Sequence, residues 1–329
     1  AEFAALSPDP SRAAKGKLRR NPTNQKPIPT ALNVRFVLEA DPRIGPHVWQ
    51  DQHLMTVHLG DEEIVEHDIT ALGMWLDDAY GLSVKAGAVT DAVLTLAMTR
   101  RRDPLQEYLL DMGEQWDGVE RLDTWLMAGL GVDDTPLNRV YGRRALVGVA
   151  ARGLEPGCKM DTMLVLCGPQ AAKKSSSLRA LVGAQWFSDT RLDLASKDAL
   201  QHFRRPWVHE FAELEGMSKA SENRVKAITA SQVDDYRPPY ARNNAQFPRR
   251  CCFFATTNEP VFLSDPTGER RSWPVTTGDC DPIWFEANRD QLWGEAVVAY
   301  TKGERWWFTR EEDMARDSMV DAYRLTDPW

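Results

Sequence analysis

The sequence lacks long apolar runs, a dense set of cysteines and any excess of positive charge. No apolar stretch approaches the ~20 residues that a transmembrane helix needs. The five cysteines show neither metal-ligand spacing nor a disulfide pattern, which favours buried, reduced thiols and a cytoplasmic protein. A net charge of −8 argues against attraction to nucleic acid over the whole surface, but it leaves local basic patches open.

Two segments run against this acidic balance. Residues 1–27 are basic and rich in proline, without apolar periodicity, which predicts a disordered basic arm. Residues 218–250 form the second basic segment, whose cations are Lys219, Arg224, Lys226, Arg237, Arg242, Arg249 and Arg250. This segment is a candidate surface for nucleic acid, since positive charge there stands out from the rest of the chain.

Residues 28–103 are predicted to form a helical or winged-helix-like module. A helix is expected to begin at Pro29-Thr30 and to end before Asp41, and residues 53–59 alternate like a short strand. Residues 104–329 are predicted to form a second domain. It begins with a helical tract, and four strand-like runs follow, at 162–167, 207–211, 251–257 and 272–275. Strands that alternate with helices predict an α/β fold with a parallel sheet covered on both faces.

The stretch from Met163 to Leu181 has the layout of a phosphate-binding loop between a strand and a helix. Gly168 begins the turn and Lys174-Ser175 opens the helix, as in G-x-x-x-x-G-K-[ST] with one mismatch. Such a loop binds phosphates through backbone N–H groups, a lysine and a hydroxyl that holds Mg²⁺. The alternative interpretation is an ordinary strand-to-helix turn.

Two expected glycines are absent from this loop. Lys173 occupies the second required glycine position, and Ala171 stands where many such loops carry another. A β-carbon at a position that needs a positive φ costs roughly 1–2 kcal/mol. These substitutions are expected to weaken nucleotide binding about tenfold rather than abolish it.

One acid interrupts the strand-like run at 207–211, and a second acid follows it. Glu210 lies within the apolar sequence WVHEF, and Glu213 follows it. A carboxylate on an interior strand is costly unless it is paired or close to a metal. In phosphate-loop ATPases we expect such a strand beside the loop strand, with its acids at Mg²⁺ and the attacking water. Surface acids on an edge strand are the alternative.

Polar residues also follow the next strand. Asn258 ends it and is a candidate γ-phosphate sensor, although asparagine is also common at ordinary strand ends. Arg270 and Arg271 follow the turn-forming sequence DPTG and could reach a phosphate. A solvated arginine pair is the alternative.

In this order the motifs resemble the virulence-associated protein E family of phage, prophage and genomic-island ATPases. That family is similar to the superfamily-3 helicases of viral replication. The motifs that carry the resemblance are QWDGVERLDTWL (115–126), EPGCKMDTMLVLCGPQ (155–170), QWFSD (185–189), WVHEFAELE (207–215), VKAIT and DDYRPPYAR (within 225–242), PRRCCFFATTNEP (248–260) and DPTGERRSWPV (265–275).

The resemblance implies a P-loop core of the AAA+ type, with ATP and Mg²⁺ as cofactors, that assembles as a homo-oligomeric ring, a hexamer. It further implies a replicative helicase of a mobile genetic element, acting on single-stranded or forked DNA and away from membranes. A primase or a replication-initiation protein is an expected partner.

The resemblance also assigns roles to residues. The nucleotide contacts are Gly168, Gln170, Ala172, Lys173, Lys174, Ser175 and Ser176, with Ser175 and Glu210 at the metal. The catalytic candidates are Glu210, Glu213, Asn258 and the arginine fingers Arg270 and Arg271. The DNA-binding candidates, on a hairpin that faces a central channel, are Lys226, Arg237, Tyr240 and Arg242. Which of the two glutamates binds metal water and which polarises the nucleophile stays open.

Three functions are compatible with these residues. The first is a DNA-dependent ATPase and helicase. The second is a DNA-binding oligomeric scaffold whose ATP site has decayed, which the AAKK sequence of the loop favours. The third is a different phosphoryl-transfer enzyme, such as a kinase, on the same core.

Overall fold

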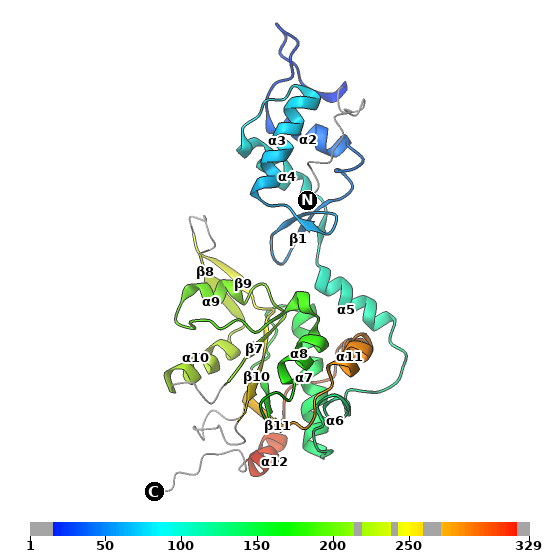
Figure 1. The fold of residues 1–329 in the computed structure, drawn as a ribbon, viewed down its shortest axis with the longest axis vertical. Coiled ribbons are helices and arrows are strands. Elements are labelled where there is room, and N and C mark those ends of the chain that lie inside the picture. The colour runs from blue at the N-terminus through cyan, green and yellow to red at the C-terminus, as the bar shows by residue number, and fades with distance from the viewer. Residues whose placement is uncertain (1–15, 214–218, 238–242, 259–270, 321–329) are drawn as a thin grey trace. The chain divides into compact units, whose positions relative to one another are not determined.

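Apolar residues gather in two separate groups along the chain, and each group forms the core of its own unit. Figure 1 shows the fold in a computed structural model, which describes residues 16–213, 219–237, 243–258 and 271–320. The two units are Ala1–Pro104 and Leu105–Trp329. No helix among the described residues is long and apolar enough to cross a membrane.

In the described residues, the N-terminal unit combines helices with a small four-stranded sheet. Its helices are α2 (Ala31–Ala40), α3 (Glu66–Tyr80) and α4 (Ala86–Ala97). Its strands are β1 (Val48–Asp51), β2 (Val57–Leu59), β3 (Glu62–Glu63) and β4 (Arg101–Arg102), in the order β3-β2-β1-β4. As expected, α2 begins after Thr30, whose hydroxyl accepts from the backbone N–H of Asn33. Of the strand expected at 53–59, only residues 57–59 form one (β2), because residues 52–56 turn between β1 and β2.

The predicted disordered arm is wrong for residues 16–27, while residues 1–15 lie outside the described part of the chain. Leu18 is buried in the core of the N-terminal unit. The fully buried Asn33 side chain accepts from the N–H of Arg19 and donates to the carbonyls of Arg19 and Ile28, each at 2.8 Å. One apolar residue and one asparagine from the following helix thus fix a segment that has no periodicity of its own.

The C-terminal unit contains the predicted α/β fold. Its helices are α5 (Pro104–Glu114), α6 (Trp125–Leu130), α7 (Pro136–Leu154), α8 (Lys174–Val182), the 3₁₀ helix η2 (Ala184–Trp186), α9 (Lys197–His202), α10 (Lys219–Ala230), α11 (Pro282–Thr301) and α12 (Arg310–Val320). Its strands are β5 (Met163–Cys167), β6 (Phe187–Ser188), β7 (Val208–Phe211), β8 (Val233–Tyr236), β9 (Ala245–Pro248), β10 (Cys252–Thr257) and β11 (Ser272–Thr276).

Five of these strands form one sheet in which every neighbouring pair is parallel. Their order is β11-β5-β10-β7-β6, so the four predicted strands are confirmed and β6 adds a short edge. The acidic strand β7 was expected beside the loop strand β5, and this is wrong. Strand β10 pairs with both and lies between them. Sequence order does not reveal such an insertion, because each strand is followed by a crossover connection.

Helices cover both faces of this sheet, as Figure 1 shows. Alternate residues of β5 point to opposite faces: Leu164 and Leu166 pack in the same core as α7, α8 and α11. Met163, Val165 and Cys167 pack in a second core with residues of α9 and α10. Four of the five cysteines are buried and all five are free, as the sequence predicted.

A separate hairpin, β8–β9, precedes the central strand β10. Its antiparallel register runs from Val233 opposite Pro248 to Tyr236 opposite Ala245. A buried ion pair between Arg249 and Asp234 closes its base, where the Arg249 Nε lies 3.0 Å from an Asp234 carboxylate oxygen. Only three residues separate β9 from β10, so the hairpin is directly attached to the sheet.

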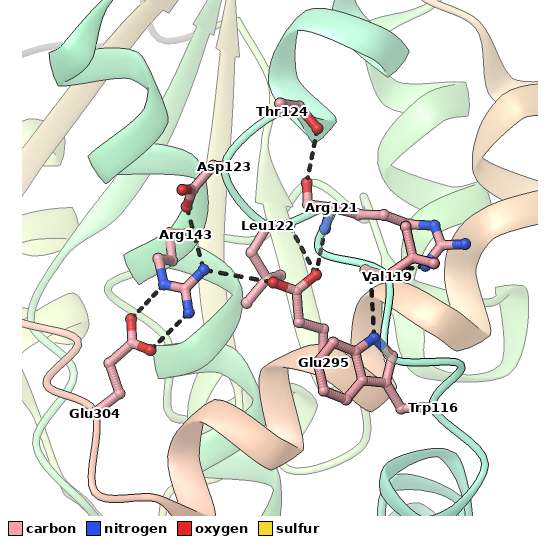
Figure 2. Close-up of polar contacts among 9 residues, drawn as sticks. All are labelled: Trp116, Val119, Arg121, Leu122, Asp123, Thr124, Arg143, Glu295 and Glu304. Atoms are coloured by element: carbon pink, nitrogen blue, oxygen red, sulfur yellow. Dashed lines mark hydrogen bonds and ion pairs between the residues drawn. The ribbon is translucent and has the colours of Figure 1, made fainter.

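A buried carboxylate joins the loop before α6 to two helices (Figure 2). Glu295 on α11 is 2% exposed and accepts from the backbone N–H groups of Arg121 and Leu122. Its other oxygen lies 3.4 Å from Arg143 on α7, whose guanidinium also contacts Asp123 and Glu304. The loop residues belong to the QWDGVERLDTWL stretch, so this stretch has a structural role in holding α6 against α7 and α11.

We expect Glu295→Gln to lower the free energy of unfolding by about 2 kcal/mol, because the amide cannot neutralise Arg143 and presents a donor to it. Urea unfolding followed by tryptophan fluorescence measures the change. Glu304→Gln is the matched control. Its side chain is partly exposed, and its loss should stay under about 1 kcal/mol. Equal losses for the two variants would contradict the role given to Glu295.

Candidate functional site

The loop after β5 begins at a glycine that its surroundings require. A β-carbon on Gly168 would lie 2.2 Å from the Thr277 Oγ1 and 3.1 Å from the Thr277 backbone oxygen. Thr277 cannot easily move, because it is buried and its N–H and hydroxyl both donate to the carbonyl of Cys167. The N–H of Gly168 in turn donates to the carbonyl of Thr257. The segments after β11 and at the end of β10 therefore hold the start of the loop.

The loop has a left-handed backbone at both positions where glycine was expected. Ala171 has a φ of 66° and Lys173 a φ of 63°. Non-glycine residues in this region cost roughly 1–2 kcal/mol each. The sequence lacks two glycines of the phosphate-loop pattern, but the backbone has the left-handed conformation for which glycine is usually required. Lys173 is also the N-cap residue of α8, so the loop leads directly into a helix N-terminus.

Lys174 and Asn258 are brought together at the carboxyl end of the sheet. The Lys174 side chain is 8% exposed, and its ammonium donates to the carbonyls of Gly168 and Pro169 at 2.7 and 2.9 Å. The Asn258 Oδ1 lies 3.2 Å from the same ammonium. Lys174 and Asn258, the residue predicted as the sensor, are thus close enough to contact the same ligand.

Glu210 connects the helix start to the acidic strand. One of its oxygens, Oε1, accepts hydrogen bonds from Ser175 Oγ and from Thr256 Oγ1, both at 2.7 Å. The residue is 1% exposed, and its Oε2 has no hydrogen-bond partner among the described residues. Burial raises the pKa of Glu210 above its ordinary value, while the hydrogen bonds from Thr256 and Ser175 lower it in part.

Ser175 and Glu210 fit a Mg²⁺ ion. Mg²⁺ prefers hard oxygen ligands and keeps several waters, so one hydroxyl and one carboxylate suffice beside substrate phosphates. The buried Oε2 of Glu210 is an oxygen of the required kind. No group of three or more His, Cys, Asp or Glu residues in the described chain could hold a metal by itself, so phosphates and waters would complete this site.

Two cavities of about 250 Å³ each open at this edge of the sheet. The first is lined by Gln170, Ala171, Ala172, Lys173, Lys174, Ser175, Ser176, Ala212, Glu213, Thr256, Thr257 and Asn258. All predicted nucleotide contacts from Gln170 to Ser176 therefore face one space, while Gly168 lies at the start of the loop. The second cavity is lined by residues 189–192, Leu194 and residues 209–213.

Glu210 on β7 and Glu213, which follows this strand, occupy different environments. Glu210 is buried against Ser175, whereas Glu213 is exposed, has a φ of 56°, and forms an ion pair with Arg191. Glu213 lines both cavities. The geometry therefore favours Glu210 for the metal and leaves Glu213 as the candidate that polarises the nucleophile.

The structure does not bring Arg271 to the loop of its own chain, and Arg270 lies outside the described residues. Arg271 precedes β11, and Ser272 pairs with Met163 at the amino end of the parallel strand β5. The loop follows the other end of β5, five residues or about 15 Å away. Arg271 is therefore at the opposite edge of the sheet.

Two of the predicted DNA contacts, Tyr240 and Arg242, also lie outside the described residues. Arg237 directly follows β8 at the open end of the hairpin, and Lys226 is half-buried on α10. A hairpin is present in this segment as β8–β9, but Lys226 lies on α10 and not on the hairpin. Sequence reasoning missed Thr256, whose signal was a hydroxyl at the end of an apolar strand.

These features define an α/β protein of the phosphate-loop type, with the loop and a buried acid at the carboxyl edge of a parallel sheet. The chain belongs to the virulence-associated protein E-like family, whose domain description, "Virulence-associated protein E-like domain", matches residues 109–324. The family to which the motifs were likened is thereby confirmed. No curated protein matches the chain.

Solved structures of the NrS-1 C-terminal region resemble the chain. An apo structure of its residues 305–718 has 10% sequence identity and a TM-score of 0.42, covering 85% of this chain and 72% of that chain. Its A form, also apo, has 12% identity and a TM-score of 0.47, covering 83% of this chain and 72% of that chain.

We expect Gly168→Ala to lower the free energy of unfolding by about 2 kcal/mol, because its methyl group would overlap Thr277. Adding Thr277→Ala removes the nearer contact, and the two changes should then be coupled by about 1 kcal/mol. Chemical unfolding of the parent, both single variants and the double variant measures this coupling. Additive losses would mean that Thr277 does not hold the loop.

Proposed function

We propose that the C-terminal unit binds ATP with Mg²⁺ and hydrolyses it, and that the protein is a DNA-dependent ATPase and helicase of a mobile genetic element. One observation carries this proposal. The Gly168–Ser175 loop adopts left-handed backbone angles at Ala171 and Lys173 and places Ser175 against the buried Glu210. In an ordinary turn, two strained residues beside a buried acid would cost free energy without serving a function.

The chemistry of phosphate binding follows from the loop and the start of α8. Backbone N–H groups at a helix N-terminus attract anions, and the helix dipole adds to this attraction. Lys174 already holds its ammonium in the loop, where it can exchange the carbonyls of Gly168 and Pro169 for phosphate oxygens. A contact between the ammonium and a charged phosphate oxygen is stronger than one between the ammonium and an uncharged carbonyl, so the exchange is favourable.

Each of the remaining residues has a role in hydrolysis. Bound Mg²⁺ would neutralise charge that develops on the phosphates. Ser175 and Glu210 hold the position for it, Glu213 accepts a proton from the attacking water, and Asn258 orients the terminal phosphate through Lys174. An arginine from a second copy supplies the remaining positive charge, because Arg271 lies at the far edge of its own sheet.

The hairpin and the family resemblance support the proposal that the protein acts on DNA as a helicase. The β8–β9 hairpin leaves the sheet directly before β10, whose end carries Asn258. Its open end belongs to the basic segment 218–250, where positive charge and Tyr240 could follow a single strand. The resemblance to phage and genomic-island ATPases implies a ring of copies around the DNA.

A scaffold that binds nucleotide without turnover is the second candidate. It is favoured by the Lys174 ammonium, which is satisfied by carbonyls of its own loop, and by the absence of both glycines. ATP hydrolysis measured across a titration of single-stranded DNA separates the two functions. We expect Mg²⁺-dependent turnover that rises with DNA.

We expect Lys174→Ala to reduce turnover at least a hundredfold, because it removes the cation that faces the phosphates. Steady-state ATP hydrolysis at saturating DNA measures this reduction, with Arg179→Ala on the same helix as the matched control for the loss of one positive charge. Parent protein that binds ATP but never hydrolyses it, with or without DNA, would favour the scaffold.

Hydrolysis should depend on a second copy. A Lys174→Ala chain and a chain carrying Arg270→Ala and Arg271→Ala should each be inactive. When mixed, they should recover part of the turnover, because some interfaces then combine an intact lysine with intact arginines. An arginine supplied in trans can contribute ~10³–10⁵ in rate, so the recovery is measurable above background. Turnover strictly proportional to protein concentration, without recovery on mixing, would overturn the shared site.

A further inference from the structure

We propose that Thr256 is a positioning residue for the metal site, which holds the carboxylate of Glu210 in its binding rotamer. The proposal rests on the nucleotide site proposed above and adds a residue to which neither the motifs nor the family resemblance gave a role. It starts from a contact to a charged, almost fully buried group. Thr256 is itself 5% exposed, so its contact to Glu210 lies almost entirely inside the protein.

The strand order places Thr256 next to Glu210. Because β10 lies between β5 and β7, the loop strand and the acidic strand are two strand spacings, or about 10 Å, apart. Phe254 of β10 pairs with Glu210, and Thr256 is two residues further along the same face. Its side chain therefore lies beside the Glu210 carboxylate, which Ser175 also contacts.

Both hydroxyls donate to the same oxygen of Glu210. Ser175 Oγ and Thr256 Oγ1 each lie 2.7 Å from Oε1, while Oε2 has no partner among the described residues. Ser175 is also the proposed metal ligand, so its hydroxyl has to serve the ion and the carboxylate at once. Thr256 has no such second task. It can keep its hydrogen bond to Oε1 while the metal binds and leaves. This bond fixes the rotamer of Glu210 and therefore the direction in which Oε2 points.

Threonine is suited to this position for two reasons. Its hydroxyl supplies the donor, and its branched β-carbon restricts χ1, so the donor direction is fixed by packing. Removing the hydroxyl should therefore leave a carboxylate that is less well oriented.

The test measures metal binding by the full chain without turnover. Mn²⁺ replaces Mg²⁺ and is followed by electron paramagnetic resonance, in the presence of a non-hydrolysable ATP analogue. The variants are Thr256→Val, which keeps the shape without the hydroxyl, and Thr256→Ser, which keeps the hydroxyl. Thr229→Val is the matched control, since Thr229 is equally buried on α10 and donates to the carbonyl of Val225.

We expect Thr256→Val to weaken Mn²⁺ binding about tenfold, the effect of losing one hydrogen bond to a charged group. Binding of the analogue in a metal chelator should change less than about twofold, on the same scale. Thr256→Ser should restore most of the affinity, and Thr229→Val should match the parent.

The outcomes separate this proposal from the function on which it rests. Parent protein that binds neither nucleotide nor Mn²⁺ would overturn both. Parent protein that binds both, with the same Mn²⁺ affinity in Thr256→Val, would overturn only the role of Thr256. A loss of stability without a change in metal binding would show a purely structural threonine. Thr256→Ala gives the same comparison if Thr256→Val does not fold.

Discussion

A parallel sheet covered on both faces offers a carboxylate one suitable place, the edge where its strands end. Along β7 the face that packs under α7, α8 and α11 begins with the apolar Val208 and ends with Glu210. At that edge the acid meets hydroxyls and the start of a helix instead of hydrocarbon. These partners reduce the cost of burying the charge. The phosphate loop, both cavities and Lys174 lie at the same edge of the sheet.

The loop is held by its neighbours more than by its own residues. Thr277 after β11 closes over Gly168, and the end of β10 accepts the Gly168 N–H. Lys174 adds hydrogen bonds across the turn to two of the loop carbonyls. These contacts stabilise the loop and offset the strain at Ala171 and Lys173.

The sequence predicted most of the sheet and part of the site. Strand-like runs such as 251–257 were identifiable because most of their residues are apolar, as expected for strands buried on both faces. The order of the strands was not accessible, since it depends on crossovers between distant segments. Leu18 and Thr256 were missed for a related reason. Each acts through a partner far along the chain, Leu18 in the core under α2 and Thr256 at Glu210, and local periodicity contains no sign of such partners.

Left-handed angles at Ala171 and Lys173 have a consequence for how such sites are found. A pattern that demands glycine in the phosphate loop would pass over this chain, whereas a comparison of backbone dihedral angles would detect it. Glycine also leaves the rim of a phosphate loop without side chains. Here both positions carry a β-carbon, and Lys173 carries an exposed chain beside the cavity. The rim of this site is therefore open to chemical variation that a glycine-built loop cannot have.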